Sequence, residues 1–177
     1  MRFSFAAEQW LPCPVPMVFA FFANPDNLPL LLPSWQATRI EWAFYQTPPP
    51  RPIPADSLRY GNRVAGQGSK LTLSFLPLPY SPVRISWRAE ITDFAWDEHF
   101  CDRLLRGPFA YWNHCHRVEP TVRDGIMGTL IMDHVDYEVP FGFTGKLAHR
   151  LFLRRQIGRL FAYRQRRLAE LLNPVAP

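Results

Sequence analysis

One stretch of the chain, residues 99–142, predicts a sheet of long antiparallel strands. Two dipeptides that favour tight turns, Gly107-Pro108 and Asp124-Gly125, divide this stretch. They separate three runs with the composition of strands: His99–Arg106, Phe109–Glu119 and Gly128–Val139. Strands joined by short turns usually pair with their neighbours in sequence, so we expect a β-meander.

The first turn predicts which residues of the first two strands lie opposite each other. A turn centred on Pro108 places Asp102 opposite His114. The same register places Cys101 opposite Cys115. The chain has three cysteines, which fit no metal-binding spacing, and in a reducing compartment we expect free thiols.

The second turn completes one face of the meander. A turn centred between Val122 and Arg123 places His116 opposite Thr129. Because side chains alternate along a strand, one face collects the following residues: Phe100, Asp102, Leu104, Trp112, His114, His116, Val118, Met127, Thr129, Ile131, Asp133, Val135 and Tyr137. A mostly apolar face with a few polar groups is typical of the wall of a ligand pocket.

The remaining sequence predicts the other elements of one α+β domain spanning residues 1–177. Expected strands are Arg2–Trp10, Trp35–Phe44, Lys70–Phe75 and Val83–Phe94, and two short helices follow the first strand at Pro14–Asn24 and Asp26–Leu32. The proline-rich segment 47–57 predicts an extended loop. Only the amphipathic C-terminal helix, residues 144–172, is long enough to cover a sheet of about seven strands.

Composition indicates a globular protein, since 47% of the residues are hydrophobic and 20% are charged. Arg2 is not followed by an apolar segment of a signal peptide, and no apolar run approaches the length of a membrane span. We therefore expect a soluble, cytoplasmic protein that is a monomer or a homodimer.

Positive charge is concentrated near the end of the chain, where residues 145–172 hold eight of the 20 basic residues and one of the 15 acidic residues. Such a helix face is usually solvated, but it can also meet an anionic membrane surface. We therefore keep peripheral membrane contact as one expectation for this helix, and we do not expect nucleic acid as a partner.

Several motifs resemble those of one known superfamily. They are Pro14–Phe22 with Asn24-Pro25, Phe100-x-Asp102, Gly107-Pro108-Phe109, Trp112-x-His114-x-His116, Gly128-Thr129, Asp133, Tyr137-x-x-Pro140-x-Gly142 and Phe161-x-Tyr163-Arg164. In these the chain resembles the SRPBCC superfamily, also called START-like or Bet v 1-like, and in particular its bacterial single-domain members labelled cyclase/dehydrase or "cell division inhibitor". The resemblance implies a helix-grip fold, in which a strongly bent antiparallel sheet surrounds the C-terminal helix. It fixes no activity, because members bind or convert very different ligands.

We expect a small hydrophobic or amphipathic ligand to bind between the sheet and the last helix. The predicted binding residues are Phe100, Asp102, Leu104, Trp112, His114, His116, Val118, Ile131, Asp133, Val135, Tyr137, Ile157, Phe161 and Arg164. Among them the histidines, Asp133 and Arg164 would orient the polar end of the ligand. Arg164 falls within the apolar stripe of its helix, so we also expect it to form an ion pair with Asp133 or Asp102.

Other functions remain open for the same residues. A polyketide cyclase or dehydratase would use His114 or Asp133 as its acid or base. A metal site would need three or four ligands to converge from neighbouring strands, and we expect neither a metal nor a cofactor. A third possibility is a protein that contacts membranes or partners through the arginine-rich helix.

Overall fold

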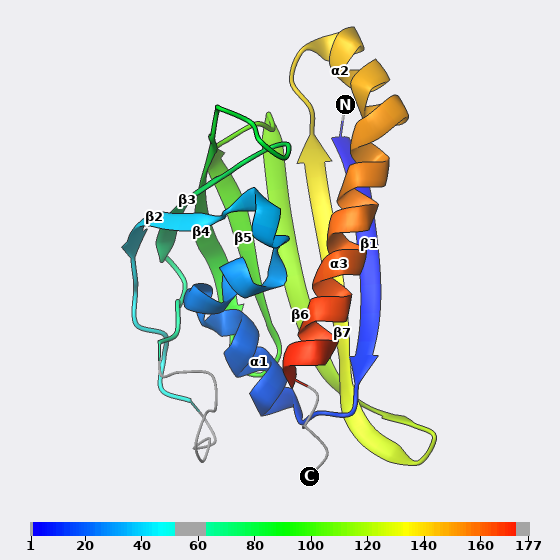
Figure 1. Cartoon of the computed structure of the whole chain (residues 1–177). Coiled ribbons are helices and arrows are strands. Elements are labelled where there is room, and N and C mark those ends of the chain that lie inside the picture. The colour runs from blue at the N-terminus through cyan, green and yellow to red at the C-terminus, as the bar shows by residue number, and fades with distance from the viewer. Residues whose placement is uncertain (1, 52–62, 173–177) are drawn as a thin grey trace.

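The computed structural model describes residues 2–51 and 63–172 (Figure 1). The strands are β1 (Arg2–Leu11), β2 (Arg39–Phe44), β3 (Lys70–Phe75), β4 (Ile85–Ala95), β5 (His99–Arg106), β6 (Tyr111–Arg123) and β7 (Ile126–Glu138). The helices are α1 (Val15–Ala23), the 3₁₀-helices η1 (Pro25–Leu31) and η2 (Ser34–Gln36), α2 (Gly142–Ala148), the π-helix η3 (His149–Leu153) and α3 (Arg154–Leu172). The predicted α+β fold, with its bent sheet around a long final helix, is confirmed.

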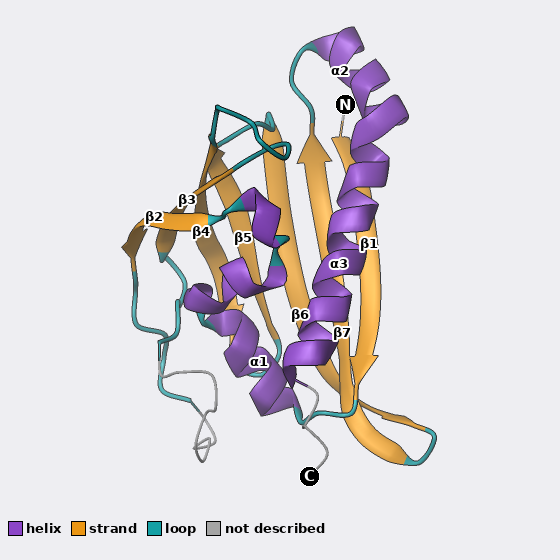
Figure 2. Ribbon diagram, in the orientation of Figure 1, coloured by secondary structure: helices purple, strands orange, loops and turns teal. Residues whose placement is uncertain are grey.

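All seven strands form one antiparallel sheet in the order β1-β7-β6-β5-β4-β3-β2. Three register shifts, at Ile40/Trp42, Arg88/Ala89 and Ile91/Asp93, lie in the β2–β5 half of the sheet. Each extra residue bends its strand and increases the local twist, which curves this half of the sheet toward the helices. Figure 2 shows the helices on one side of the sheet.

The β5–β6 register agrees with the prediction, since Asp102 pairs with His114 and Phe100 pairs with His116. The predicted β6–β7 register is wrong. The turn lies at Asp124-Gly125, and both residues have positive φ angles, 52° and 76°, as a tight two-residue hairpin requires.

This turn lies two residues beyond the predicted position, so the pairing shifts by four residues. His116 pairs with Asp133 instead of Thr129, and Trp112 pairs with Tyr137. Because the shift is even, the residues predicted to share a face still share it.

The two cysteines of the β5–β6 hairpin do lie opposite each other, as expected. They form a disulfide, Cys101–Cys115, so the expectation of free thiols is wrong for this structure. That expectation rested on an assumed reducing compartment and not on geometry. Cys13 is a free, buried cysteine.

The predicted C-terminal helix consists of three consecutive helical elements, α2, η3 and α3, of which η3 is a π-helical turn. The predicted apolar stripe is confirmed in part, because Ile157, Phe161, Leu168 and Leu172 are buried against the sheet. The first part of the predicted proline-rich loop packs on α1 and the β4–β5 turn, where Arg51 forms an ion pair with Asp97. The rest of the predicted 47–57 loop lies outside the described residues.

Candidate functional site

A row of polar side chains crosses the helix-covered face of the sheet. Asp102 of β5, His114 and His116 of β6, and Asp133 of β7 belong to this row. The strand pairing explains why they meet: Asp102 is opposite His114, and Asp133 is opposite His116. Because the two histidines are two residues apart on one strand, both rings point to the same side. We call these four residues the polar row.

The polar row separates two apolar clusters of the interior. One cluster is built on Phe100, Val118 and Ile131 of the sheet with α1 and the end of α3. The other contains Trp112, Val135, Tyr137, Ile157 and Phe161. Polar groups in such a position must bond with one another or with a partner, because an unsatisfied buried polar group is destabilising.

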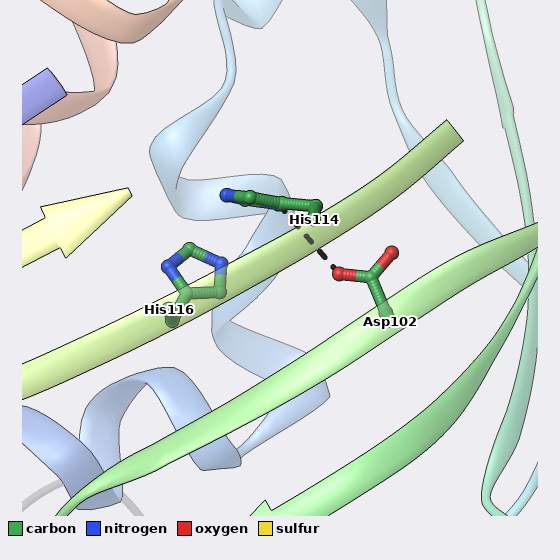
Figure 3. A group of neighbouring side chains, drawn as sticks. All are labelled: Asp102, His114 and His116. Atoms are coloured by element: carbon green, nitrogen blue, oxygen red, sulfur yellow. Dashed lines mark ion pairs between the residues drawn. The ribbon is translucent and has the colours of Figure 1, made fainter. Parts of the chain in front are cut away.

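Asp133 is the centre of the row. Its Oδ1 lies 3.1 Å from Nε2 of His114 in a hydrogen bond. The same oxygen lies 2.6 Å from Nδ1 of His116. That second contact lacks the direction of a hydrogen bond, so Nδ1 of His116 is buried without a hydrogen-bond partner. On the other side, Oδ2 of Asp102 lies 3.6 Å from Nδ1 of His114, beyond hydrogen-bonding distance (Figure 3).

Burial changes the proton affinities of this row. It lowers the pKa of His114 to about 4, helped by the neighbouring His116, and the contacts with Asp133 and Asp102 only partly oppose it. Burial raises the pKa of Asp102. For Asp133 burial acts in the same upward direction, but His116 and the hydrogen bond from His114 outweigh it, so the pKa is well below the usual range. At neutral pH, therefore, His114 is an uncharged ring hydrogen-bonded to an ionised carboxylate.

Aromatic rings hold the two imidazoles in place. His116 lies between Phe22 and Phe100, with ring centroids 5.0 Å and 4.7 Å away. Phe161 of α3 contacts the His114 ring edge-on at 5.5 Å. The last helix therefore covers the polar row, and the imidazoles have little freedom to rotate.

The structure brings the predicted binding residues together between this face of the sheet and α3. Those that are buried are Phe100, Trp112, His114, His116, Val118, Ile131, Asp133, Val135, Tyr137, Ile157 and Phe161. Asp102, Leu104 and Arg164 are half-buried. Met127, predicted on the same face, is 63% exposed, because the β6–β7 hairpin extends past the helices.

Arg164 does not form the predicted ion pair. Within the described part of the chain, no carboxylate oxygen of Asp102 or Asp133 lies within 4.0 Å of its guanidinium. Its carbon Cζ instead lies 5.1 Å from the centre of the Phe161 ring, a cation–π contact. Its charge still acts on Asp102, where it opposes the rise in pKa that burial causes.

Two further features were missed by the sequence analysis. His149 of η3 is buried, stacks on Phe3 at 3.6 Å and is hydrogen-bonded to the Tyr137 hydroxyl at 2.8 Å. The second feature is a group of exposed apolar side chains, the apolar tip: Phe141, Phe143, Leu147, Leu151 and Phe152. A count of apolar residues beside the arginines of this segment would have revealed the tip.

Solved structures provide the comparison. A crystal structure of a protein from Chromobacterium violaceum superposes with a TM-score of 0.65 at 13% identity, covering 97% of this chain and 98% of that one. The chain has the helix-grip fold. Norcoclaurine synthase from Thalictrum flavum, whose fold is Bet v 1-like, gives a TM-score of 0.60 at 15% identity over 97% of this chain and 87% of that one.

A protein from Mycobacterium smegmatis also matches, with a TM-score of 0.58 at 14% identity over 96% of this chain and 90% of that one. At these identities the likeness concerns the fold alone. No protein-family model matches the chain, and no curated protein matches it. Among the described residues, no helix is both long and apolar enough to cross a membrane.

Proposed function

We propose that the protein binds a small hydrophobic or amphipathic molecule between the curved sheet and the C-terminal helix. The observation that carries this proposal is the polar row, which is enclosed by two apolar clusters. Its buried imidazole and carboxylate groups could hydrogen-bond to a polar group of a bound molecule. The surrounding apolar side chains would bury the remainder of that molecule.

The half-buried members of the second apolar cluster mark the side from which such a molecule would enter. Trp87, Leu104 and Phe109 pack against this cluster yet keep part of their surface exposed. Trp87 and Phe109 both contact Trp112, with ring centroids 5.1 Å and 4.8 Å away. We assign the apolar part of the ligand to these rings and its polar end to the polar row.

A pair of neighbouring substitutions tests this assignment. Leu104 packs against the second apolar cluster, whereas Leu105, the unpaired residue at the Arg88/Ala89 register shift, is 42% exposed. Leu104→Trp should place a bulkier side chain in the cluster that contains Trp112 and weaken binding of an amphipathic fluorescent probe, anilinonaphthalene sulfonate, at least about tenfold. Leu105→Trp adds the same side chain at an exposed position and should leave probe binding unchanged. Equal probe binding by both variants would contradict the proposal.

Native mass spectrometry of the purified protein would identify a natural ligand directly. A co-purified molecule should be retained by Leu105→Trp and lost from Leu104→Trp. A different outcome is that the protein converts this molecule to a product. If His114→Gln then abolishes conversion but not binding, the protein is an enzyme that uses His114 as its base. The ring of His114 is neutral near pH 7 and could accept a proton, but its pKa of about 4 makes it a weak base.

Peripheral membrane contact is a second candidate function, favoured by the apolar tip. Figure 1 shows α2 projecting past the end of β7. Phe141 and Phe143 are 83% and 80% exposed at this end, and Phe152 is 66% exposed. Arg150, Arg154 and Arg155 are exposed in the adjoining turns. Exposed aromatic groups flanked by arginines match the surface of an anionic bilayer, in which the rings insert and the cations meet lipid headgroups.

Vesicle co-sedimentation tests this second function. The double variant Phe141→Ser/Phe143→Ser should release the protein from vesicles of phosphatidylcholine and phosphatidylglycerol. Phe44→Ser is the matched control, because Phe44 is 50% exposed on β2, away from the tip. Binding that survives the double variant, or that is absent from the wild type, would exclude the tip as a membrane anchor.

A further inference from the structure

Three potential metal ligands converge within the polar row, the same residues to which the polar end of the proposed ligand is assigned. One carboxylate oxygen of Asp102 and one nitrogen each of His114 and His116 all lie within 4.8 Å of one another (Figure 3). From the sequence we expect no metal, because such donors would have to converge from neighbouring strands. The β5–β6 pairing supplies that convergence.

The geometry places a nitrogen of His114 next to a carboxylate. Nε2 of this ring is hydrogen-bonded to Asp133 at 3.1 Å. Its Nδ1, on the other side of the ring, lies 3.6 Å from Oδ2 of Asp102. This nitrogen and this oxygen are both suitable metal ligands.

His116 supplies a second ring nitrogen. Its side chain is 6% exposed, and its Nδ1 lies 2.6 Å from Oδ1 of Asp133. The contact fixes the ring beside His114. A cation between the three groups would satisfy the Asp102 oxygen and a nitrogen of each ring together.

Asp133 occupies the position of an outer-shell residue. In metal sites a ligating histidine commonly donates its other ring N–H to a carboxylate, which fixes the ring and increases its basicity. Asp133 accepts such a bond from His114 at 3.1 Å. Its charge also balances a divalent cation together with that of Asp102.

We propose that Asp102, His114 and His116 bind a divalent transition-metal ion of the zinc class, with Asp133 orienting His114. Two imidazoles and one carboxylate suit Zn²⁺, Co²⁺ or Fe²⁺ better than Ca²⁺ or Mg²⁺. Tetrahedral coordination with Zn–N bonds of 2.0–2.1 Å needs donors about 3.4 Å apart. Asp102, whose side chain is 22% exposed, can rotate to shorten the present spacing. Three protein ligands leave one coordination position for water or for a polar group of a bound molecule.

Titration with Co²⁺ tests this proposal without any organic ligand. Tag-free protein treated with a chelator should bind one equivalent of Co²⁺, with the visible absorption bands of a tetrahedral site, and Zn²⁺ should displace it. Asp102→Asn keeps the shape of the side chain but removes its charge, and His116→Gln removes a ring donor. Both variants should lose the bands at one equivalent, and Asp133→Asn should weaken binding by about 10–100-fold.

His99→Gln is the matched control, because His99 and Asp93 form an exposed pair at 3.0 Å outside this site. This variant should bind Co²⁺ as the wild type does. Circular dichroism verifies that each variant is folded. Absence of the bands from the wild type, or bands that persist in folded Asp102→Asn, would overturn the metal proposal. Either result leaves the proposed ligand binding to be judged by the Leu104 and Leu105 variants.

Discussion

Oδ1 of Asp133 lies 3.1 Å from Nε2 of His114, and this contact determines which nitrogen of the ring carries the proton. The carboxylate remains ionised because its pKa is well below the usual range. It must therefore accept the hydrogen bond, and Nε2 must donate it. The opposite nitrogen of His114, which faces Asp102, is then left with a lone pair.

The first prediction concerns pH. The pKa of His114 falls from its ordinary value of 6.5 to about 4 in the folded protein. Between these values the unfolded chain binds a proton that the folded protein excludes, so stability should fall as the pH decreases from 6.5 toward 4. The loss should reach roughly 3 kcal/mol in urea unfolding. Asp133, with its lowered pKa, adds a further loss at lower pH, as its carboxylate becomes protonated.

The variant His114→Gln provides the control for this pH dependence. It should flatten the stability curve between pH 6.5 and 4, because the titrating ring has been removed. If the wild-type curve is already flat in this range, His114 is not the neutral, buried ring described above.

The second prediction compares two aspartates of β7. Asp133 is 8% exposed and bonded to His114, whereas Asp136 forms only an exposed pair with His134 at 3.4 Å. Asp133→Ala should lower the free energy of unfolding by about 2–3 kcal/mol, since a hydrogen bond to a buried charged group is lost. Asp136→Ala should change it by less than about 0.5 kcal/mol. Similar losses in chemical denaturation would refute the central role of Asp133.

The third prediction concerns the disulfide between Cys101 and Cys115, which closes a loop with a sequence separation of 14 residues. Cross-linking a loop of this size restricts the unfolded chain and contributes up to about 3 kcal/mol. Dithiothreitol should therefore lower the midpoint of urea unfolding of the wild type. The double variant Cys101→Ser/Cys115→Ser should start from the lower midpoint and show no response to the reductant. A wild-type midpoint that is insensitive to reduction would count against this bond.

The fourth prediction contrasts two glycines. A Cβ atom at Gly128 would lie against the carbonyl oxygen of Leu11 and 2.6 Å from a Trp10 ring carbon. Gly128→Ala should therefore destabilise the protein by about 1–3 kcal/mol through overpacking. Gly158 lies within α3, where its Cβ would approach only Phe5, at 4.0 Å. Gly158→Ala should raise thermal stability by up to about 1 kcal/mol, because alanine favours helix. Shifts of the same sign in thermal unfolding would disprove this reading.

The sequence predicted the fold well because periodicity directly reflects burial. The alternation along residues 99–106 and the helical repeat of Ile157, Phe161 and Leu168 follow from which side chains avoid water. The face of the site was predicted for the same reason. The residue pairs between β6 and β7 were not predicted correctly. A longer turn centred two residues earlier leaves the same side chains on each face, so alternation does not distinguish the two registers. The Asp124-Gly125 dipeptide favours the tighter turn, and the positive φ angles of both residues show that this turn is the one formed.

Other features depend on distances that alternation does not encode. The meeting of Asp133 with His116 required the correct register. The position of Arg164 over Phe161 depends on the rotation of α3, which an inserted π-turn alters. The disulfide could be located from the hairpin but not assigned, because sequence does not record the redox state.

The pairing of β1 with β7 has a consequence for synthesis on the ribosome. Arg2 lies opposite Glu138, so β1 is synthesised well before β7, the strand with which it pairs. During this interval β1 lacks a template, while the consecutive hairpins from β4 to β7 can form as they appear. Completion of the sheet therefore waits until β7 has been made. A chaperone that holds β1 during this interval would protect its unpaired edge from other nascent chains.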